Sequence, residues 1–222
     1  MSQRVILTGA TGMVGEGVLL TCLAAPDVEA VLSISRRASG HAHPRLRELL
    51  VPDFFDLSAI ESQLTGYTAC FFCAGVSAVG MSEADYTRAT HDLTLHFAQT
   101  LARHSPALTL VYVSGSGTDS RQQSRQMWAR VKGRTENDLL ALPFRGSYMF
   151  RPALMQPLAG QQHVKPLLAL MGRLTPLRRR LAPAYACTLR EVALAMLAVA
   201  RRGADKLVLE VPDLVRLAGQ KL

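Results

Sequence analysis

The stretch Thr8-Gly9-Ala10-Thr11-Gly12-Met13-Val14-Gly15 decides the fold of this chain. Residues 5–8 before it are apolar and typical of a strand, and residues 12–23 have the pattern of a helix. Glycines at positions 9, 12 and 15 would make a tight turn, let the backbone approach a pyrophosphate, and allow the helix to pack closely on the strand. The unpaired N–H groups of such a helix N-terminus attract phosphate. The stretch therefore predicts a dinucleotide-binding turn with these candidate residues: Gly9, Thr11, Gly12, Met13, Val14 and Gly15.

Beyond this turn, short apolar runs alternate with helical periodicity along the chain. Further strands are predicted at residues 30–35, 47–54, 69–74, 108–113, 146–150 and 207–211. Helices are predicted at residues 57–64, 81–104, 126–142, 189–202 and, as a last helical turn, 213–218. Repeated strand–helix–strand units require parallel strands with helices on both faces. We therefore predict a doubly wound α/β fold of Rossmann type, one domain over residues 1–222 with a small C-terminal lobe.

The regular pattern loosens after Arg151, where five prolines interrupt residues 152–188. This segment is predicted to be irregular. Order returns at the helix over residues 189–202, because Thr188 and Glu191 have the spacing of a capping box and Gly203 is a C-terminal stop.

Composition narrows the class of protein. The chain has 222 residues, of which 49% are hydrophobic and 19% charged, and this excludes a wholly disordered chain. The longest clean apolar stretch, residues 192–200, is too short to span a membrane, and no signal-peptide pattern opens the sequence. Cys70 and Cys73 would point to opposite faces of a strand, which predicts two core residues and no metal site. We expect a cytosolic protein.

The formal net charge of +8 favours an anionic partner: a phosphorylated cofactor, nucleic acid or an anionic membrane surface. The end of the second predicted strand, about twenty residues after the glycines, is where a carboxylate would bind the ribose of NAD. This chain has no acid there and carries Arg36 and Arg37 instead. Guanidinium groups suit a 2′-phosphate, so NADP(H) is predicted, with NADPH preferred over NADH. The alternative is that both arginines are merely solvated.

The sequence resembles a family. The TGxxGxxG turn, the basic end of the second strand, Asp53-Phe54 and Cys73-Ala74-Gly75 resemble an atypical short-chain dehydrogenase/reductase. The resemblance is to the extended, epimerase-like branch, and in detail to the group of HIV Tat-interacting oxidoreductase-like proteins. It implies that Asp53 and Phe54 border the adenine, and that Ala74 and Gly75, with Cys73 beside them, line the ribose and phosphates. It also implies that residues 152–188 cover the substrate.

The same resemblance implies a catalytic serine, tyrosine and lysine. Lys132 stands at the lysine position, where it would bind the nicotinamide ribose, and Ser114 or Ser116 stands at the serine position. Trp128 replaces the tyrosine, four residues before Lys132. An indole N–H donates a hydrogen bond but is no proton donor near neutral pH. Trp128 would either cover the nicotinamide or pack against the sheet, and Tyr185 is a speculative substitute acid.

Two hypotheses of function follow. The first is an NADP-dependent oxidoreductase acting on a small carbonyl or alcohol. The second is a redox-inactive NADP(H)-binding regulator or scaffold. Residues 165–180 are basic and rich in apolar residues, and we interpret them as a helix packed on the domain. The second interpretation is a substrate lid, and further alternatives are a dimer face or a peripheral membrane contact. No recognised nucleic-acid-binding motif accompanies the arginines of residues 165–180, so nucleic acid is not expected as a partner. No metal site is expected, and the oligomeric state is left open.

Overall fold

A computed structural model describes residues 2–164 and 182–220 of the chain. Its centre is a seven-stranded sheet in which every neighbouring pair is parallel, with the order β3-β2-β1-β4-β5-β6-β9. The strands are β1 (Gln3–Thr8), β2 (Val28–Ser35), β3 (Leu46–Leu50), β4 (Ala69–Phe72), β5 (Thr109–Val113), β6 (Gly146–Arg151) and β9 (Val208–Glu210). The predicted doubly wound α/β fold is confirmed.

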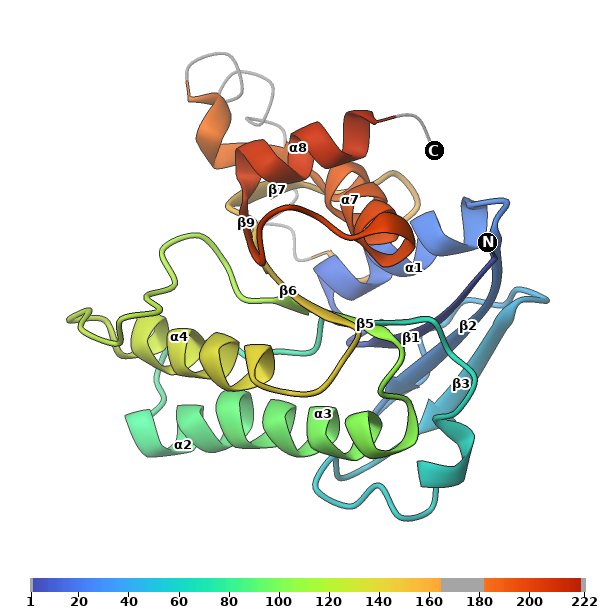
Figure 1. Cartoon of the computed structure of the whole chain (residues 1–222), viewed down its shortest axis with the longest axis horizontal. Helices are drawn as coiled ribbons and strands as arrows, with labels where there is room; N and C mark the ends of the chain where they lie inside the picture. The colour runs from blue at the N-terminus through green and yellow to red at the C-terminus, as the bar shows by residue number, and fades with distance from the viewer. Residues whose placement is uncertain (1, 165–181, 221–222) are drawn as a thin grey trace.

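Helices cover both faces of the sheet (Figure 1). One layer contains α1 (Met13–Ala24), α7 (Leu189–Arg202) and α8 (Val211–Gly219). The other contains α2 (Glu83–Thr87), a π-helical turn η2 (Arg88–Asp92), α3 (Leu93–His104) and α4 (Met127–Leu140). The helix predicted over residues 81–104 is thus present but carries a π-helical turn, a feature that often lies near functional sites.

The strands are buried on both faces, as a parallel sheet requires. Leu7 of β1 belongs to the apolar cluster under α1 and α7, whereas Ile6 belongs to the cluster under α3 and α4. Cys70 lies in the second cluster and Cys73 packs against the first, so the two thiols are on opposite faces, as predicted. Among the described residues, no group of three or more His, Cys, Asp or Glu side chains could hold a metal ion.

Several boundaries differ from the sequence prediction. The strand predicted over residues 47–54 ends at Leu50, because Pro52 offers no N–H to the ladder and Asp53 accepts the Phe55 N–H at 2.9 Å in a local turn. The helix predicted at residues 57–64 is only the 3₁₀ turn η1 (Glu61–Gln63). Residues 213–218 are part of a full helix, α8, which Pro212 helps to start in its first turn.

The described parts of residues 152–188 contain a pair of short strands. Strand β7 (Leu154–Gln156) pairs in parallel with β8 (Ala186–Thr188), which follows the short turn η3 (Pro183–Tyr185). The sequence missed this pair because strands of three residues leave almost no periodicity. The capping box at the start of α7 and the positive φ of Gly203 at its end are both present. The amphipathic helix predicted at residues 165–180 lies outside the described residues. No described helix is long and apolar enough to cross a bilayer.

Candidate functional site

The strand order reverses between β1 and β4, and the glycine turn lies at the carboxyl ends of these two strands. In such sheets the crevice at this point is where ligands bind. The Thr8 hydroxyl accepts a hydrogen bond from the Ala74 N–H at 3.2 Å, which ties the two strand ends together. The turn after β1 and the loop after β4 therefore form one edge of a common site.

Each glycine of the turn has a separate steric role. Gly9 has φ +76°, and a Cβ there would lie 2.6 Å from the Ala74 nitrogen. A Cβ on Gly15 would lie 2.1 Å from the Gly9 carbonyl oxygen, so helix and turn are in direct contact at this point. Gly12 is exposed, and a Cβ there would meet only the Gly9 oxygen at 3.5 Å. Gly12 is also the N-cap of α1 without a side-chain cap, which leaves the first N–H groups of the helix for an anion.

Two adjoining cavities follow this edge. The first, of about 130 Å³, lies over the glycine turn, and the second, of about 190 Å³, lies beside it. The first is lined by Gly9, Thr11, Gly12, Ser35, Arg36, Arg37, Phe54, Cys73, Ala74 and Gly75. The second is lined by Arg36, Pro52, Asp53, Phe54, Phe55, Ala74, Gly75, Val76, Ala89 and Leu93. The structure thus brings together predicted cofactor residues from four separate loops, while Met13, Val14 and Gly15 form the helix start behind them. Lys132, also predicted to bind the cofactor, lines neither cavity.

Arg36 and Arg37 follow β2 and face the glycine turn across the first cavity. Both side chains are exposed, and within the described ranges neither guanidinium makes a hydrogen bond or ion pair. Their backbone is nevertheless fixed: the Ser35 hydroxyl donates to the Arg37 carbonyl at 2.6 Å, and Glu48 accepts the Ser39 N–H at 2.9 Å. The loop therefore holds two unpaired cations at the edge of the cavity.

The predicted catalytic residues lie at the end of β5 and on α4. The Lys132 ammonium donates to the carbonyl of Ser114. The Ser114 hydroxyl is buried and donates to Glu136 at 2.5 Å. Burial lowers the pKa of Lys132, and the nearby negative charge of Glu136 acts in the opposite direction. The predicted lysine and one of the two serines are thus in direct contact.

Sequence reasoning missed Glu136 and its partner Arg151. Glu136 is fully buried one helical turn after Lys132, and the Arg151 Nε donates to it at 2.9 Å. Arg151 also donates to the Ser120 hydroxyl at 2.6 Å and to Glu210 at 3.3 Å. This network joins α4, the loop after β5 and the ends of β6 and β9. The four-residue spacing of Lys132 and Glu136 on one helix was the only sequence signal for it.

Trp128 lies half-buried at the start of α4 and packs over the loop that follows β5. A Cβ on Gly117 would lie 3.2 Å from the Trp128 ring. Ser116, in the same loop, donates its backbone N–H to the Pro152 carbonyl at 2.9 Å, and its hydroxyl has no partner among the described residues. The contact with Gly117 places the indole beside the serine loop, one helical turn from Lys132.

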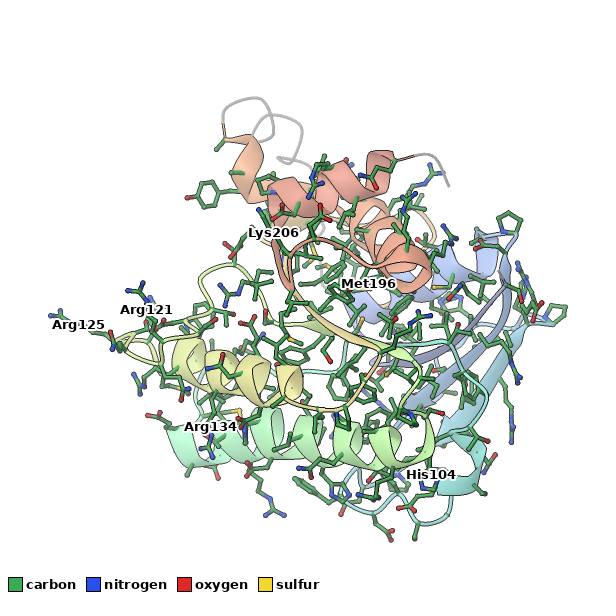
Figure 2. All side chains as sticks on the ribbon, in the orientation of Figure 1. His104, Arg121, Arg125, Arg134, Met196 and Lys206 are labelled. Carbon is green, nitrogen blue, oxygen red and sulfur yellow. The ribbon has the colours of Figure 1, made fainter. Side chains whose placement is uncertain are left out.

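The remainder of this loop projects from the body of the protein. Figure 2 shows Arg121 and Arg125 at its tip, pointing away from the sheet. The base of the loop is held by Asp119, whose carboxylate accepts the N–H groups of Gln123 and Ser124 at 2.7 Å each. A Cβ on Gly133 would lie 1.8 Å from the Asp119 carbonyl oxygen, so α4 and the loop base are in close contact.

The tyrosines do not occupy the position of Trp128. Tyr112 is 2% exposed in the sheet core, and burial raises its pKa far above the ordinary value. Tyr148 is also buried, and its hydroxyl accepts the Ala204 N–H at 3.3 Å. Both side chains pack in the interior of the protein. Tyr185, the speculative substitute acid, is 62% exposed on η3.

The parallel sheet, with its glycine turn at the strand-order reversal, defines a Rossmann-type α/β protein. The chain belongs to the NAD dependent epimerase/dehydratase family, which matches residues 5–128. The protein fmp52, mitochondrial, of Emericella nidulans is 34% identical over 166 residues, which are 72% of this chain and 68% of that protein.

Solved structures share the fold. The UDP-N-acetylglucosamine 4-epimerase of Methanobrevibacter ruminantium superposes with a TM-score of 0.66 at 15% identity, over 97% of this chain and 80% of that chain. The enzyme WbmF of Bordetella bronchiseptica, solved in complex with NAD+, gives a TM-score of 0.66 at 16% identity, over 97% of this chain and 77% of that chain.

The expected cytosolic location is contradicted by these relatives. The Emericella nidulans protein is named as mitochondrial, and so are relatives from Aspergillus terreus, Chaetomium globosum and Candida glabrata. The prediction rested on the lack of a long apolar stretch and of a signal-peptide pattern, and neither feature distinguishes the cytosol from the mitochondrion.

Proposed function

We propose that this chain is an NADP(H)-dependent oxidoreductase acting on a small carbonyl or alcohol. The observation that carries the cofactor choice is the pair Arg36 and Arg37, which border the cavity over the glycine turn without a partner within the described ranges. No carboxylate follows β2 at this point, and Asp53 in the neighbouring cavity is engaged with the Phe55 N–H. A 2′-phosphate would find two guanidinium groups and no opposing acid.

The residues of the groove suit the rest of the dinucleotide. The free N–H groups at the start of α1 would receive the pyrophosphate, and Phe54 with Leu93 would pack against the adenine. Lys132 would bind the nicotinamide ribose, and the Ser116 hydroxyl would orient the substrate oxygen. The cofactor, when bound, supplies the hydride chemistry.

Calorimetric titration with NADPH and NADH tests the cofactor choice. We expect tighter binding of NADPH, and we expect Arg36→Ala to reduce the difference by about 1–3 kcal/mol, as for a charge-assisted hydrogen bond. Arg202→Ala, which removes an exposed arginine at the end of α7, is the matched control and should leave the difference unchanged. Equal affinities for the two cofactors, or tighter NADH, would overturn the proposal.

A second candidate function is a redox-inactive NADP(H)-binding regulator or scaffold. Two observations favour it: Trp128 stands at the position of the family acid, and the Ser114 hydroxyl is occupied by Glu136. Turnover of NADPH with a panel of small aldehydes and ketones distinguishes the candidates. Measurable reduction supports the oxidoreductase, whereas tight NADPH binding without turnover on any substrate supports the regulator.

A further inference from the structure

Glu16 is a fully buried carboxylate immediately after the glycine turn, on the first turns of α1. Four groups from elsewhere in the chain bind it, one of them the Gln161 side-chain amide, which donates at 3.5 Å. The N–H groups of Gln162 and His163 donate to its two oxygens at 2.6 and 2.8 Å, and the His41 Nε2 lies 2.9 Å from one of them. A buried charge is retained only when it is paired or hydrogen-bonded in this way.

The partners belong to two segments. We call residues 158–163 the strap and residues 36–41, which carry Arg36 and Arg37, the arginine loop. Within the strap, Gln161 donates to the Met13 carbonyl at 2.7 Å and accepts the Leu158 N–H at 2.7 Å. The strap is therefore fixed on the first turn of α1, with Glu16 at its centre.

The strap and the arginine loop also contact each other. The His163 Nε2 lies 2.9 Å from the carbonyl oxygen of Ser39, so this nitrogen carries the proton and donates. His41, at the end of the loop, binds Glu16 from the other side. Besides its bonds to Ser35 and Glu48, the arginine loop is thus held at two points that depend on Glu16, one directly and one through the strap.

We infer that Glu16 is a positioning residue that sets the preference for NADP(H) over NAD(H) by fixing the arginine loop. The inference rests on the proposed function. Glu16 has no exposed surface and does not line the cofactor groove, so it acts on the cofactor only through the segments that it holds. Arg36 and Arg37 have no side-chain partner within the described ranges, and their place at the groove is set by the loop backbone. A loop held in its binding conformation binds with less loss of entropy.

The charge state of Glu16 agrees with this role. Burial by itself raises the pKa of Glu16, but the hydrogen bonds from the Gln162 and His163 N–H groups and from His41 outweigh it, and the pKa is lowered. Glu16 is therefore ionised at neutral pH. Substitution by glutamine removes the charge and replaces one accepting oxygen by an NH₂ group, which accepts nothing.

The test is calorimetric titration of Glu16→Gln with NADPH and with NADH. We expect the NADPH affinity to fall about tenfold, as for loss of a hydrogen bond to a charged group, while the NADH affinity changes little. A general loosening of the fold would weaken both cofactors together. Glu61→Gln is the matched control, because Glu61 also binds a histidine, His104 at 3.2 Å, but lies outside the groove.

If the natural protein prefers NADPH and a folded Glu16→Gln variant keeps the full preference, this inference alone is overturned. A natural protein without any preference would overturn the proposed cofactor choice and this inference with it. If Glu16→Gln does not fold, His163→Ala removes only the ring contact with the Ser39 carbonyl. A reduced NADPH preference in that variant supports the inference, and an unchanged preference overturns it.

Discussion

The hydroxyl of Ser114 donates to the carboxylate of Glu136 at 2.5 Å, while the ammonium of Lys132 binds the carbonyl of the same serine. The end of β5 is therefore held by two consecutive turns of α4. This arrangement holds the Ser114 side chain in the protein interior, whereas the Ser116 hydroxyl has no partner among the described residues. Under the proposed function, Ser116 is therefore the serine that we expect to contact a substrate.

The buried pair of Glu136 and Arg151 makes a stability prediction. Glu136→Gln should lower the free energy of unfolding by about 3–5 kcal/mol, because it leaves the Arg151 guanidinium, 12% exposed, without its buried counter-charge. Ser114→Ala removes one hydrogen bond and should cost about 1–3 kcal/mol. Urea unfolding measures both. Glu83→Gln, which removes an exposed pair with Arg130, should cost less than about 1 kcal/mol. A Glu136 variant no less stable than this control would contradict the prediction.

In the glycine turn, we expect an alanine at position 15 to lower the stability of the fold and an alanine at position 12 to weaken cofactor binding. Gly15→Ala places a Cβ 2.1 Å from the Gly9 oxygen, so we expect a loss of about 1–3 kcal/mol in stability or more. Gly12→Ala meets its nearest atom at 3.5 Å, so it should fold normally yet lose NADPH binding, because the methyl group occupies the path of the pyrophosphate. Thermal unfolding and calorimetry compare the two. Unimpaired NADPH binding by Gly12→Ala would place the pyrophosphate elsewhere.

The parts of the structure that depend on the local pattern of residues could be predicted from the sequence. Short apolar runs between helical segments predicted the parallel sheet, and the glycine spacing predicted the position of the groove, because both depend on neighbours in the chain. Glu16 and Glu136 were missed. Their partners are distant in sequence, between 15 residues for Arg151 with Glu136 and 147 for His163 with Glu16, and a carboxylate in a helix is ordinarily a solvated surface group. The 3₁₀ turn at Glu61–Gln63 shows the opposite case. Leu57, Ile60 and Leu64 are all buried, but their burial did not require the full helix that was predicted.

The lowered pKa of Glu16 predicts a dependence of stability on pH. Its pKa in the folded protein lies below the ordinary value of 4.5, so the stabilisation is fully present above pH 4.5 and is lost as the pH falls through the folded value. At pH 7, Glu16→Gln should be less stable than the natural protein by about 1.5–3 kcal/mol. The difference should shrink as the pH falls below 4.5. Urea unfolding from pH 3 to 7 measures it, and a difference independent of pH would contradict the assignment.

Substitution of Trp128 distinguishes the oxidoreductase from the redox-inactive regulator, because an indole cannot replace a phenol as a proton donor. Lys132, four residues on, is held by the Ser114 carbonyl with its ammonium on the same helix face. In Trp128→Tyr the new phenol would lie beside this ammonium, which lowers a phenol pKa toward the working range.

We expect Trp128→Tyr to gain reductase activity on small aldehydes and ketones, by up to about 10²-fold, the lower end of the contribution of general acid catalysis. Trp128→Phe is the matched control, because it provides a ring of similar size without an ionisable proton and should show no gain. The measurement is NADPH oxidation at matched cofactor saturation. If the natural protein already reduces the panel rapidly and the tyrosine variant is slower, another residue donates the proton. The redox-inactive regulator would then lose its main support.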